Sequence, residues 1–240
     1  MYYCVDLERG SVFYLFFSFH TASLFFPPVY LFVNMVKTYK DECELGFCMS
    51  KETDMEKVTT SIENCRKCNL WKTRKNCVVG DGSLKSEILF VGEAPGYNED
   101  VQGRPFVGKA GKILDELLLS IGLQRNEIYI ANILKCRPPN NRNPLKTEIE
   151  ACTDYLDKQI EIIQPSVISP LGNFACSYIF EKFGLNYDKI SAIHGKTFSV
   201  NTLLGNIHMI PLYHPAVATY NPNTKSTLLE DFKSIKKIIG

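Results

Sequence analysis

From Glu87 to Gly96 the chain reads EILFVGEAPG, a compact apolar run that ends in a loop containing proline and glycine. Short runs rich in Ile, Leu, Val and Phe with such boundaries are typical of buried strands. The same kind of run returns at Glu127–Leu134 (EIYIANIL) and at Ser166–Pro170 (SVISP). We therefore expect three strands, each of which is followed by a loop at its carboxyl end.

Helical periodicity occupies the intervals between these runs. Apolar residues recur at helical spacing over Lys109–Ile121, which Gly122 ends, and over Lys146–Ile163, which Pro165 closes. Further expected elements are a short helix over Met55–Arg66, a helix over Asn173–Phe183, strands over Lys196–Val200 and Ile207–Leu212, and a helix over Lys225–Ile239. This alternation predicts a single α/β domain with a mostly parallel central sheet flanked by helices, and a ligand beyond the carboxyl ends of the strands.

The charge of the chain is close to neutral, with a formal net charge of +1. Residues 1–54 hold 4 Lys/Arg and 7 Asp/Glu, which leaves 23 basic and 19 acidic residues, or +4, for the rest. A modest positive charge suits a protein that binds DNA weakly and often, but many unrelated enzymes carry the same charge. Charge alone therefore does not decide between these classes.

The first part of the chain differs from the rest. From Ser11 to Val33 it holds no Lys, Arg, Asp or Glu. This uncharged stretch is long enough to span a bilayer, but two prolines at 27 and 28 would break a helix there. A membrane anchor is one interpretation. We favour the other, a translation start at Met35, Met49 or Met55, so a membrane location is not expected. We predict an N-terminal extension over residues 1–54 and the working domain over residues 55–240.

Nine cysteines are many for 240 residues, and an odd number without a regular framework argues against a disulfide-stapled secreted domain. A reducing compartment with some thiols on a metal is the better interpretation. Cys65 and Cys68 form a C-x-x-C pair, while Cys136 follows a predicted strand and Cys152 lies on a predicted helix. Four thiolates suit structural zinc or an iron–sulfur cluster, and spacing does not distinguish the two. Alternatively, Cys136 and Cys152 are simply small buried residues.

Four motifs carry a resemblance to a known family. They are GEAPG at 92–96, QGRPFVG at 102–108, NILKCRPP around Asn132, and HPA at 214–216. In this order, and together with the four cysteines, they resemble the family 4 uracil-DNA glycosylases of thermophilic archaea and bacteria. The resemblance runs from about Asn64 to Pro222. It implies a DNA repair enzyme that flips uracil out of DNA and hydrolyses its N-glycosidic bond, leaving an abasic site.

The resemblance also implies roles for individual residues. The four cysteines fall where the family ligates a [4Fe-4S] cluster, which is thought to order DNA-contacting loops and to take no part in the chemistry. Phe106 falls where an aromatic ring stacks on the flipped uracil, and Asn132 where an amide reads its Watson–Crick edge. His214 falls where an imidazole bonds to uracil O2. The expected partner is uracil-containing DNA, with a sliding clamp as a further candidate, and we expect a cytoplasmic, prokaryotic monomer.

Physical reasoning supports these roles. A base must leave the duplex before its glycosidic bond is accessible, at a cost of roughly a few kcal/mol, and stacking on an aromatic ring recovers about 1–3 kcal/mol. An asparagine amide can match uracil N3–H and O4 and mismatch cytosine. A neutral histidine that donates to O2 stabilises the negative charge developing on the leaving base.

The loop after the first strand departs from the GQDPYH of the related family 1 enzymes, because Ala94 and Gly96 replace the Asp and Tyr. We expect Gly92 and Ala94 to lie at the substrate, and a loop carbonyl assisted by Glu93 to position the water. The loop around Glu99 is expected to exclude the methyl group of thymine. Tyr220 is a candidate for the wedge that enters the minor groove, since leucines are missing there.

Taken singly, these residues have ordinary structural explanations. Phe106 could be a core aromatic residue, His214 a structural histidine whose hydrogen bonds are satisfied, and Asn132 a turn or capping residue. One rival is a superfamily cousin that binds uracil-DNA covalently, but its Arg-rich, His-containing insertion is missing because Gly108 runs directly into Lys109. A second rival is a non-enzymatic iron–sulfur module that docks to a repair or replication protein. It would not require Phe106, Asn132 and His214 together.

Overall fold

The computed structural model describes residues 50–202 and 205–239. By its internal contacts the chain divides into two units, residues 1–50 and 51–240, and the account below concerns the second. The apolar stretch from Ser11 to Val33 lies outside the described residues. Among the helices that are described, none has the length and apolar character needed to cross a membrane. The first of them, α2, begins at Lys51, four residues before the expected start of the domain.

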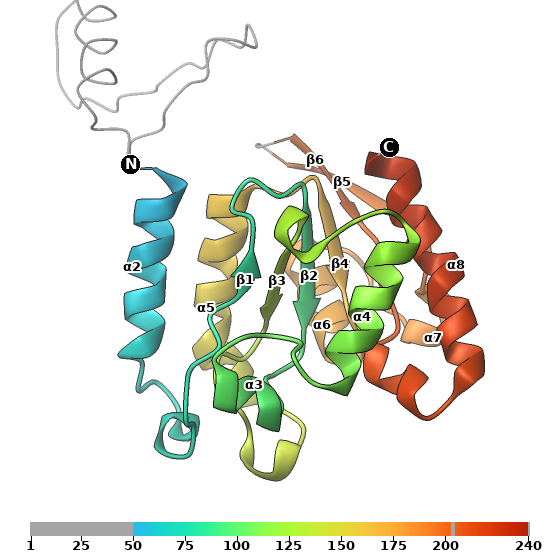
Figure 1. Ribbon diagram of the computed structural model, residues 1–240. Coiled ribbons are helices and arrows are strands. Elements are labelled where there is room, and N and C mark those ends of the chain that lie inside the picture. Colours follow the sequence, from blue (N-terminus) through green and yellow to red (C-terminus); the bar gives the residue numbers. More distant parts are fainter. Residues whose placement is uncertain (1–49, 203–204, 240) are drawn as a thin grey trace, which may run out of the picture. The chain divides into compact units, whose positions relative to one another are not determined.

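A six-stranded sheet forms the centre of this unit, in the order β1-β3-β2-β4-β6-β5 (Figure 1). The strands are β1 (Asp81–Gly82), β2 (Ile88–Gly92), β3 (Tyr129–Asn132), β4 (Val167–Pro170), β5 (Phe198–Thr202) and β6 (Gly205–Met209). The four central strands run parallel, while β1 and β5 pair antiparallel at the two edges. The predicted fold class, an α/β domain with a mostly parallel sheet, is confirmed.

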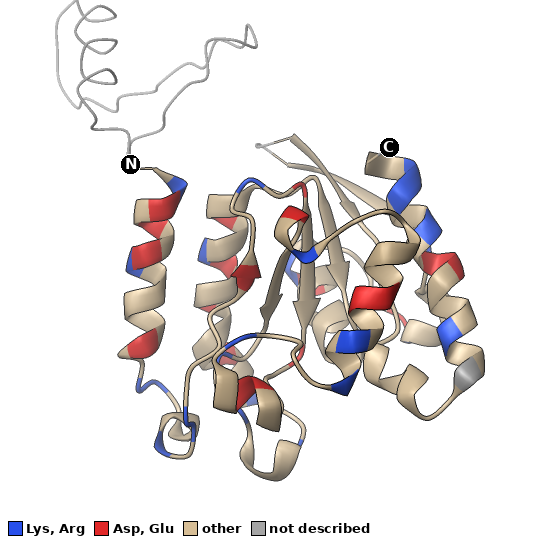
Figure 2. Ribbon diagram, in the orientation of Figure 1, with Lys and Arg blue, Asp and Glu red and all other residues tan. Residues whose placement is uncertain are grey.

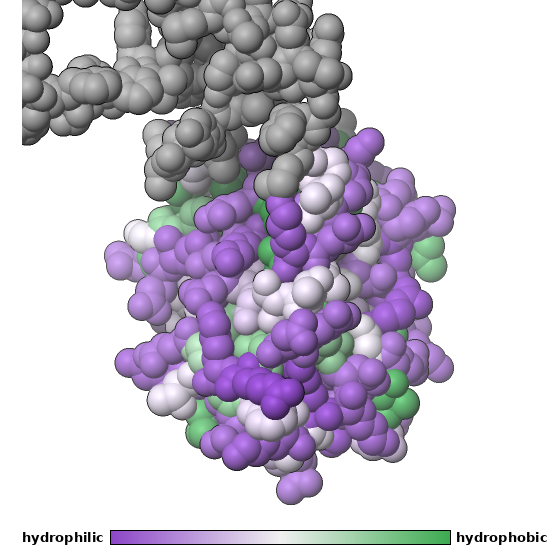
Figure 3. Space-filling model, turned by 90° about the vertical axis from the view of Figure 1, so that its left-hand side faces the viewer, coloured by the Kyte–Doolittle hydropathy of each residue, from purple (hydrophilic) through white to green (hydrophobic). Residues whose placement is uncertain are grey.

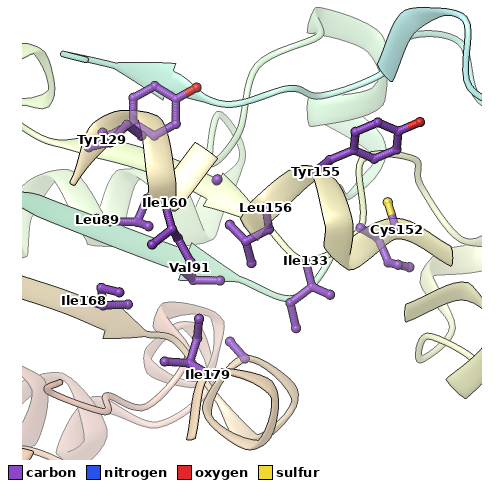
Figure 4. Close-up of a cluster of buried hydrophobic side chains, with 14 of the residues drawn as sticks. Leu89, Val91, Tyr129, Ile133, Cys152, Tyr155, Leu156, Ile160, Ile168 and Ile179 are labelled. Carbon is purple, nitrogen blue, oxygen red and sulfur yellow. The ribbon is translucent and has the colours of Figure 1, made fainter. Parts of the chain in front are cut away.

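Helices cover both faces of the sheet, and β2 shows why. Leu89 and Val91 point into one apolar cluster with α2 (Lys51–Glu63) and α5 (Lys146–Ile163) (Figure 4). Phe90, which points the other way, packs in a second cluster with α4 (Lys109–Ser120) and α8 (Pro222–Ile239). A strand buried on both faces has no polar alternation, which explains the continuous apolar run at its position.

Shorter elements complete the fold. They are η2 (Asn69–Lys72), α3 (Tyr97–Gln102), η3 (Arg125–Glu127), η4 (Pro139–Asn141), α6 (Asn173–Lys182), α7 (Ile190–Ile193) and η5 (Pro215–Thr219). Of these the sequence predicted only α6.

The face that carries α2 is mostly hydrophilic, with apolar residues scattered over it (Figure 3).

The expected elements are all present, most of them with shifted ends. Helix α5 has the predicted bounds, whereas β6 ends at Met209 rather than at Leu212. The chain nevertheless continues beside β4, because the Leu212 amide donates to Pro170 O at 3.0 Å and Leu171 bridges Leu212. This continuation carries the chain to His214 at the carboxyl end of the sheet.

Candidate active site

Loops that follow β2, β3 and β6 enclose a cavity of about 340 Å³ at the carboxyl edge of the sheet. It is lined by Glu93, Ala94, Pro95, Gly96, Glu99, Phe106, Ala110, Pro138, Asn141, Arg142, His214 and Ala216. Five of the seven predicted site residues lie on this lining, and the other two, Gly92 and Asn132, lie beneath it. Residues more than 100 positions apart in the chain thus meet where an α/β sheet usually binds its ligand.

Gly92 and Asn132 are opposite each other in the β2–β3 pairing. A Cβ atom on Gly92 would lie 2.2 Å from Asn132 Oδ1 and 2.8 Å from Phe106 Cε2, so only glycine leaves room for both side chains. Asn132 is 2% exposed, and its amide has no hydrogen-bond partner within the described residues. Ser169 Oγ is the one polar side-chain atom there that is both sealed from solvent and unpartnered. The side-chain carboxamide of Asn132 is not sealed from solvent in this way, and it therefore remains available to a ligand.

Phe106 is held in an unusual backbone conformation, with a φ of 52°. The guanidinium of Arg125 donates to the carbonyls of Pro105 and Phe106, and pairs with Asp115. A Cβ on Gly111 would lie 1.7 Å from Phe106 O, so the first turn of α4 also needs glycine. A left-handed conformation in a non-glycine residue persists only where its surroundings impose it, as these contacts do.

The ring of Phe106 stacks with His214, at 5.6 Å between centroids and 27° between planes. His214 is the N-cap of η5, and its Nδ1 accepts a hydrogen bond from the Ala216 amide at 3.2 Å. Burial lowers the pKa of His214 to about 4, against a smaller opposing effect of Glu99. The imidazole is therefore neutral at physiological pH. Because its Nδ1 accepts, its proton resides on Nε2, which is a donor.

Two carboxylates line the cavity. Burial raises the pKa of Glu93 above its ordinary value. Glu99 Oε1 accepts from the amides of Val107 and Gly108, both at 2.9 Å, and thereby fastens the loop after β2 to the start of α4. Asp100, a third carboxylate in this loop, is 2% exposed and accepts from the Lys75 amide at 2.9 Å, away from the cavity. Glu93 and Glu99 are thus the acidic groups placed to act on a ligand.

The loop after β3 supplies another wall of the cavity. Pro138, Asn141 and Arg142 face the cavity. Arg142 donates to both oxygens of Glu148, at 2.9 and 2.6 Å, and this hydrogen bonding lowers the pKa of Glu148. The left-handed backbone of Asn141, with a φ of 54°, turns the loop back toward the pocket.

The four predicted ligand cysteines are free thiols, Cys65 and Cys68 part-exposed and Cys136 and Cys152 buried. Burial, with smaller contributions from Cys136 and Cys68, raises the pKa of Cys152 to about 12 against the lowering effect of Lys135. Burial raises the pKa of Cys136 as well, with smaller contributions from Cys68 and Cys65. Cys136 is therefore close enough to the other three thiols for their charges to affect one another. Over residues 50–202 and 205–239, no group of three or more His, Cys, Asp or Glu is arranged to hold a metal ion.

Two of these sulfur atoms accept hydrogen bonds that stabilise the negatively charged thiolate form. Arg74 Nη1 donates to Cys136 Sγ at 3.1 Å, and the Lys135 amide donates to Cys152 Sγ at 3.3 Å. Both donors favour a thiolate over a thiol. Four cysteine thiols, two of them with such donors, match the donor set of an iron–sulfur cluster in number and kind.

Lys135 joins the cysteines to the pocket, a link that sequence reasoning missed. Its side chain is 1% exposed, and its ammonium donates to Asn132 O at 2.8 Å and to Gln159 Oε1 at 2.6 Å. Burial lowers the pKa of Lys135 to about 8. The sole signal in the sequence is a lysine within the apolar run NILKC.

Comparison with known proteins identifies the class. The family model of the uracil DNA glycosylase superfamily matches residues 79–234, and the chain belongs to that superfamily. A type-4 uracil-DNA glycosylase from Sulfurisphaera tokodaii is 49% identical over 185 residues, or 77% of this chain and 84% of the relative. Its counterpart from Archaeoglobus fulgidus is 48% identical over 78% of this chain and 94% of the relative. One from Thermotoga maritima is 41% identical over 79% and 97%. The predicted resemblance to the family 4 enzymes is confirmed.

Proposed function

We propose that this protein is a monofunctional uracil-DNA glycosylase of base excision repair. The observation that carries the proposal is the meeting of Phe106, Asn132 and the neutral His214 around one cavity. Superfamily membership and the type-4 relatives support the same activity. A non-enzymatic iron–sulfur module is not favoured, because it gives no reason for these three side chains to converge.

Recognition of uracil follows from two of them. The ring of Phe106, fixed by its backbone contacts, offers a face on which the flipped base stacks. The unpartnered amide of Asn132 accepts from uracil N3–H and donates to O4. Cytosine presents the opposite pattern at these positions and leaves the buried amide unsatisfied, which discriminates against it.

Bond cleavage depends on the charge that develops on the base. As the N-glycosidic bond lengthens, the sugar becomes oxocarbenium-like and the uracil becomes anionic. His214 Nε2–H donates to O2, where it stabilises the anion without first having to lose or gain a proton. Its fixed tautomer, set by the Ala216 amide, means that the donor is already oriented before the base arrives.

Water attacks C1′ in the last step. We propose that a backbone carbonyl of the loop after β2, assisted by Glu93, positions this water, since burial gives Glu93 a raised pKa suited to accepting a proton. We propose that the segment around Glu99 excludes the methyl group of thymine. Tyr220, which is 90% exposed just after η5, is the proposed wedge in the space that the flipped base leaves.

The four cysteines 65, 68, 136 and 152 are proposed to hold a [4Fe-4S] cluster. Their number, their free state and the two hydrogen bonds to sulfur support it. The cluster has a structural role, in which it ties the segment before β1 to the loop after β3 and to α5, and supplies no catalytic group.

Other features extend the proposal. We propose that the predicted extension lies outside the working domain only as far as Ser50, because helix α2 begins at Lys51. We also propose that the enzyme acts in the prokaryotic cytoplasm as a monomer, with a sliding clamp as a candidate partner.

The activity is tested with purified protein and a uracil-containing oligonucleotide, followed by alkaline cleavage of the product. Scission at uracil and not at thymine is expected. Asn132→Ala and His214→Ala should each cut uracil release sharply while leaving the visible absorbance of the cluster intact. No scission by the folded, iron-loaded protein would overturn the enzyme proposal, and full activity of both variants would overturn the site.

A further inference from the structure

Tyr97 stands at the rim of the cavity without a role in the reaction described above. It is the first residue of α3 and directly follows Gly96, which lines the cavity. Its side chain is 55% exposed, one of the largest exposed apolar surfaces in the described part of the chain. Because exposed apolar surface often marks an interaction site, this ring is a candidate for a contact with the nucleic acid.

Two cations lie against the ring of Tyr97. The Lys75 ammonium is 5.5 Å from the ring centroid and the Arg137 guanidinium carbon is 5.2 Å from it, both within cation–π range. They come from separate segments, one before β1 and the other after β3. The charges are therefore no more than about 11 Å apart, and each repels the other.

Neither cation has a carboxylate partner among the ion pairs of residues 50–202 and 205–239. Arg137 Nε donates instead to the neutral Asn141 Oδ1 at 2.7 Å. By contrast, the nearby Lys67, Arg104 and Arg142 are each paired with an acid. Two unneutralised cations gathered on one ring are an arrangement suited to an anion.

The arrangement is held in place before any ligand arrives. The Lys75 amide donates to Asp100 Oδ1 at 2.9 Å, and Asn76 Nδ2 donates to Asp100 O and Val101 O at 2.8 and 3.0 Å. These bonds fasten the Lys75 segment to α3. The bond from Arg137 to Asn141 connects the other cation to a residue that lines the cavity. Basic residues in the loops around α3 are visible in Figure 2.

We propose that Lys75, Tyr97 and Arg137 form a binding site for a backbone phosphate of the uracil-bearing strand, next to the flipped nucleotide. The two cations contact the phosphodiester, and the Tyr97 ring positions them. This assignment rests on the proposed function, since it takes the cavity as the uracil pocket. The site holds the strand beside the pocket and contributes to affinity without reading sequence.

The first test measures binding to a single-stranded oligonucleotide with one 2′-fluorinated deoxyuridine, which resists hydrolysis, over a series of salt concentrations. Lys75→Gln and Arg137→Gln should each weaken binding and reduce the slope of log Kd against log salt by about 0.7. Lys85→Gln is the matched control, because Lys85 is exposed and precedes β2, at the opposite edge of the sheet from the cavity. It should change neither quantity.

Tyr97 is tested as a positioning residue by two substitutions. Tyr97→Phe keeps the ring and should bind like the wild type, whereas Tyr97→Leu should weaken binding about as much as loss of one cation. Equal binding by Tyr97→Leu and the wild type would remove the ring from the proposal.

A neutral methylphosphonate placed at single positions beside the fluorinated nucleotide locates the contact. At one position it should weaken binding by the wild type and have no further effect on the double variant Lys75→Gln/Arg137→Gln, which lacks both cations. Equal losses in both proteins at every position would overturn the phosphate site. If the wild type releases uracil and all the cation variants bind normally, the phosphate site is wrong and the proposed function stands. If the wild type is inactive, the proposed function is wrong.

Discussion

His214 is predicted to stay neutral while the protein is folded, down to a pH of about 4. Burial lowers its pKa from 6.5 to about 4, and the Ala216 amide occupies the nitrogen that would otherwise take the proton. Each pKa unit corresponds to 1.36 kcal/mol, so protonation of this imidazole in the folded state costs about 3 kcal/mol.

The sign of the effect on stability follows from the lowered pKa. Between about pH 6.5 and about pH 4 the unfolded chain binds this proton and the folded protein does not. Stability from this group is therefore fully present above the unfolded pKa and is lost as the pH falls through this window. Urea unfolding of the wild type and of His214→Asn isolates the group, because asparagine does not titrate. The wild type should lose about 3 kcal/mol more than the variant over the window.

The same protonation should not limit catalysis near neutrality. Single-turnover uracil release should show no loss attributable to His214 between about pH 8 and about pH 5, while ¹⁵N NMR of the imidazole should report a neutral ring protonated at Nε2. An imidazole assigned to His214 that titrates near its ordinary pKa would refute the reasoning. So would equal acid sensitivity of the wild type and His214→Asn in the unfolding measurements.

Three further predictions concern residues that support the pocket. Gly92→Ala places a methyl group against Asn132 and Phe106, so kcat/KM for uracil release should fall about 100-fold and the free energy of unfolding should fall by about 1–3 kcal/mol; full activity would show that the two side chains need not stay where they are. Lys135→Met leaves two buried oxygens without their donor and should lower the free energy of unfolding by about 1–3 kcal/mol, measured by urea titration, where unchanged stability would contradict the buried link. Cys65→Ser should lower the iron content per chain and the visible absorbance, and a full complement of iron would exclude this cysteine as a ligand.

The regular elements were accessible from the sequence where they are long or fully buried. Helix α5 was predicted with its observed bounds, because eighteen residues at helical spacing end at a proline signal. Strand β1 was missed, since a two-residue edge strand has no periodicity to detect. Helix α3 was missed because it follows the Pro- and Gly-containing loop GEAPG and offers fewer than two turns of mostly polar residues.

The sequence by itself determined the fold class, because strand and helix periodicities are local, and its resemblance to a known family indicated five of the residues that line the pocket. Tertiary structure alone decided what those residues can do. The tautomer of His214 depends on the Ala216 amide, and the placement of Phe106 depends on Arg125 far along the chain. The burial of Lys135, and the gathering of two cations on Tyr97, likewise arise from segments that meet only when the sheet forms. Burial and partnership set protonation and orientation, and neither is a property of a residue type or its spacing.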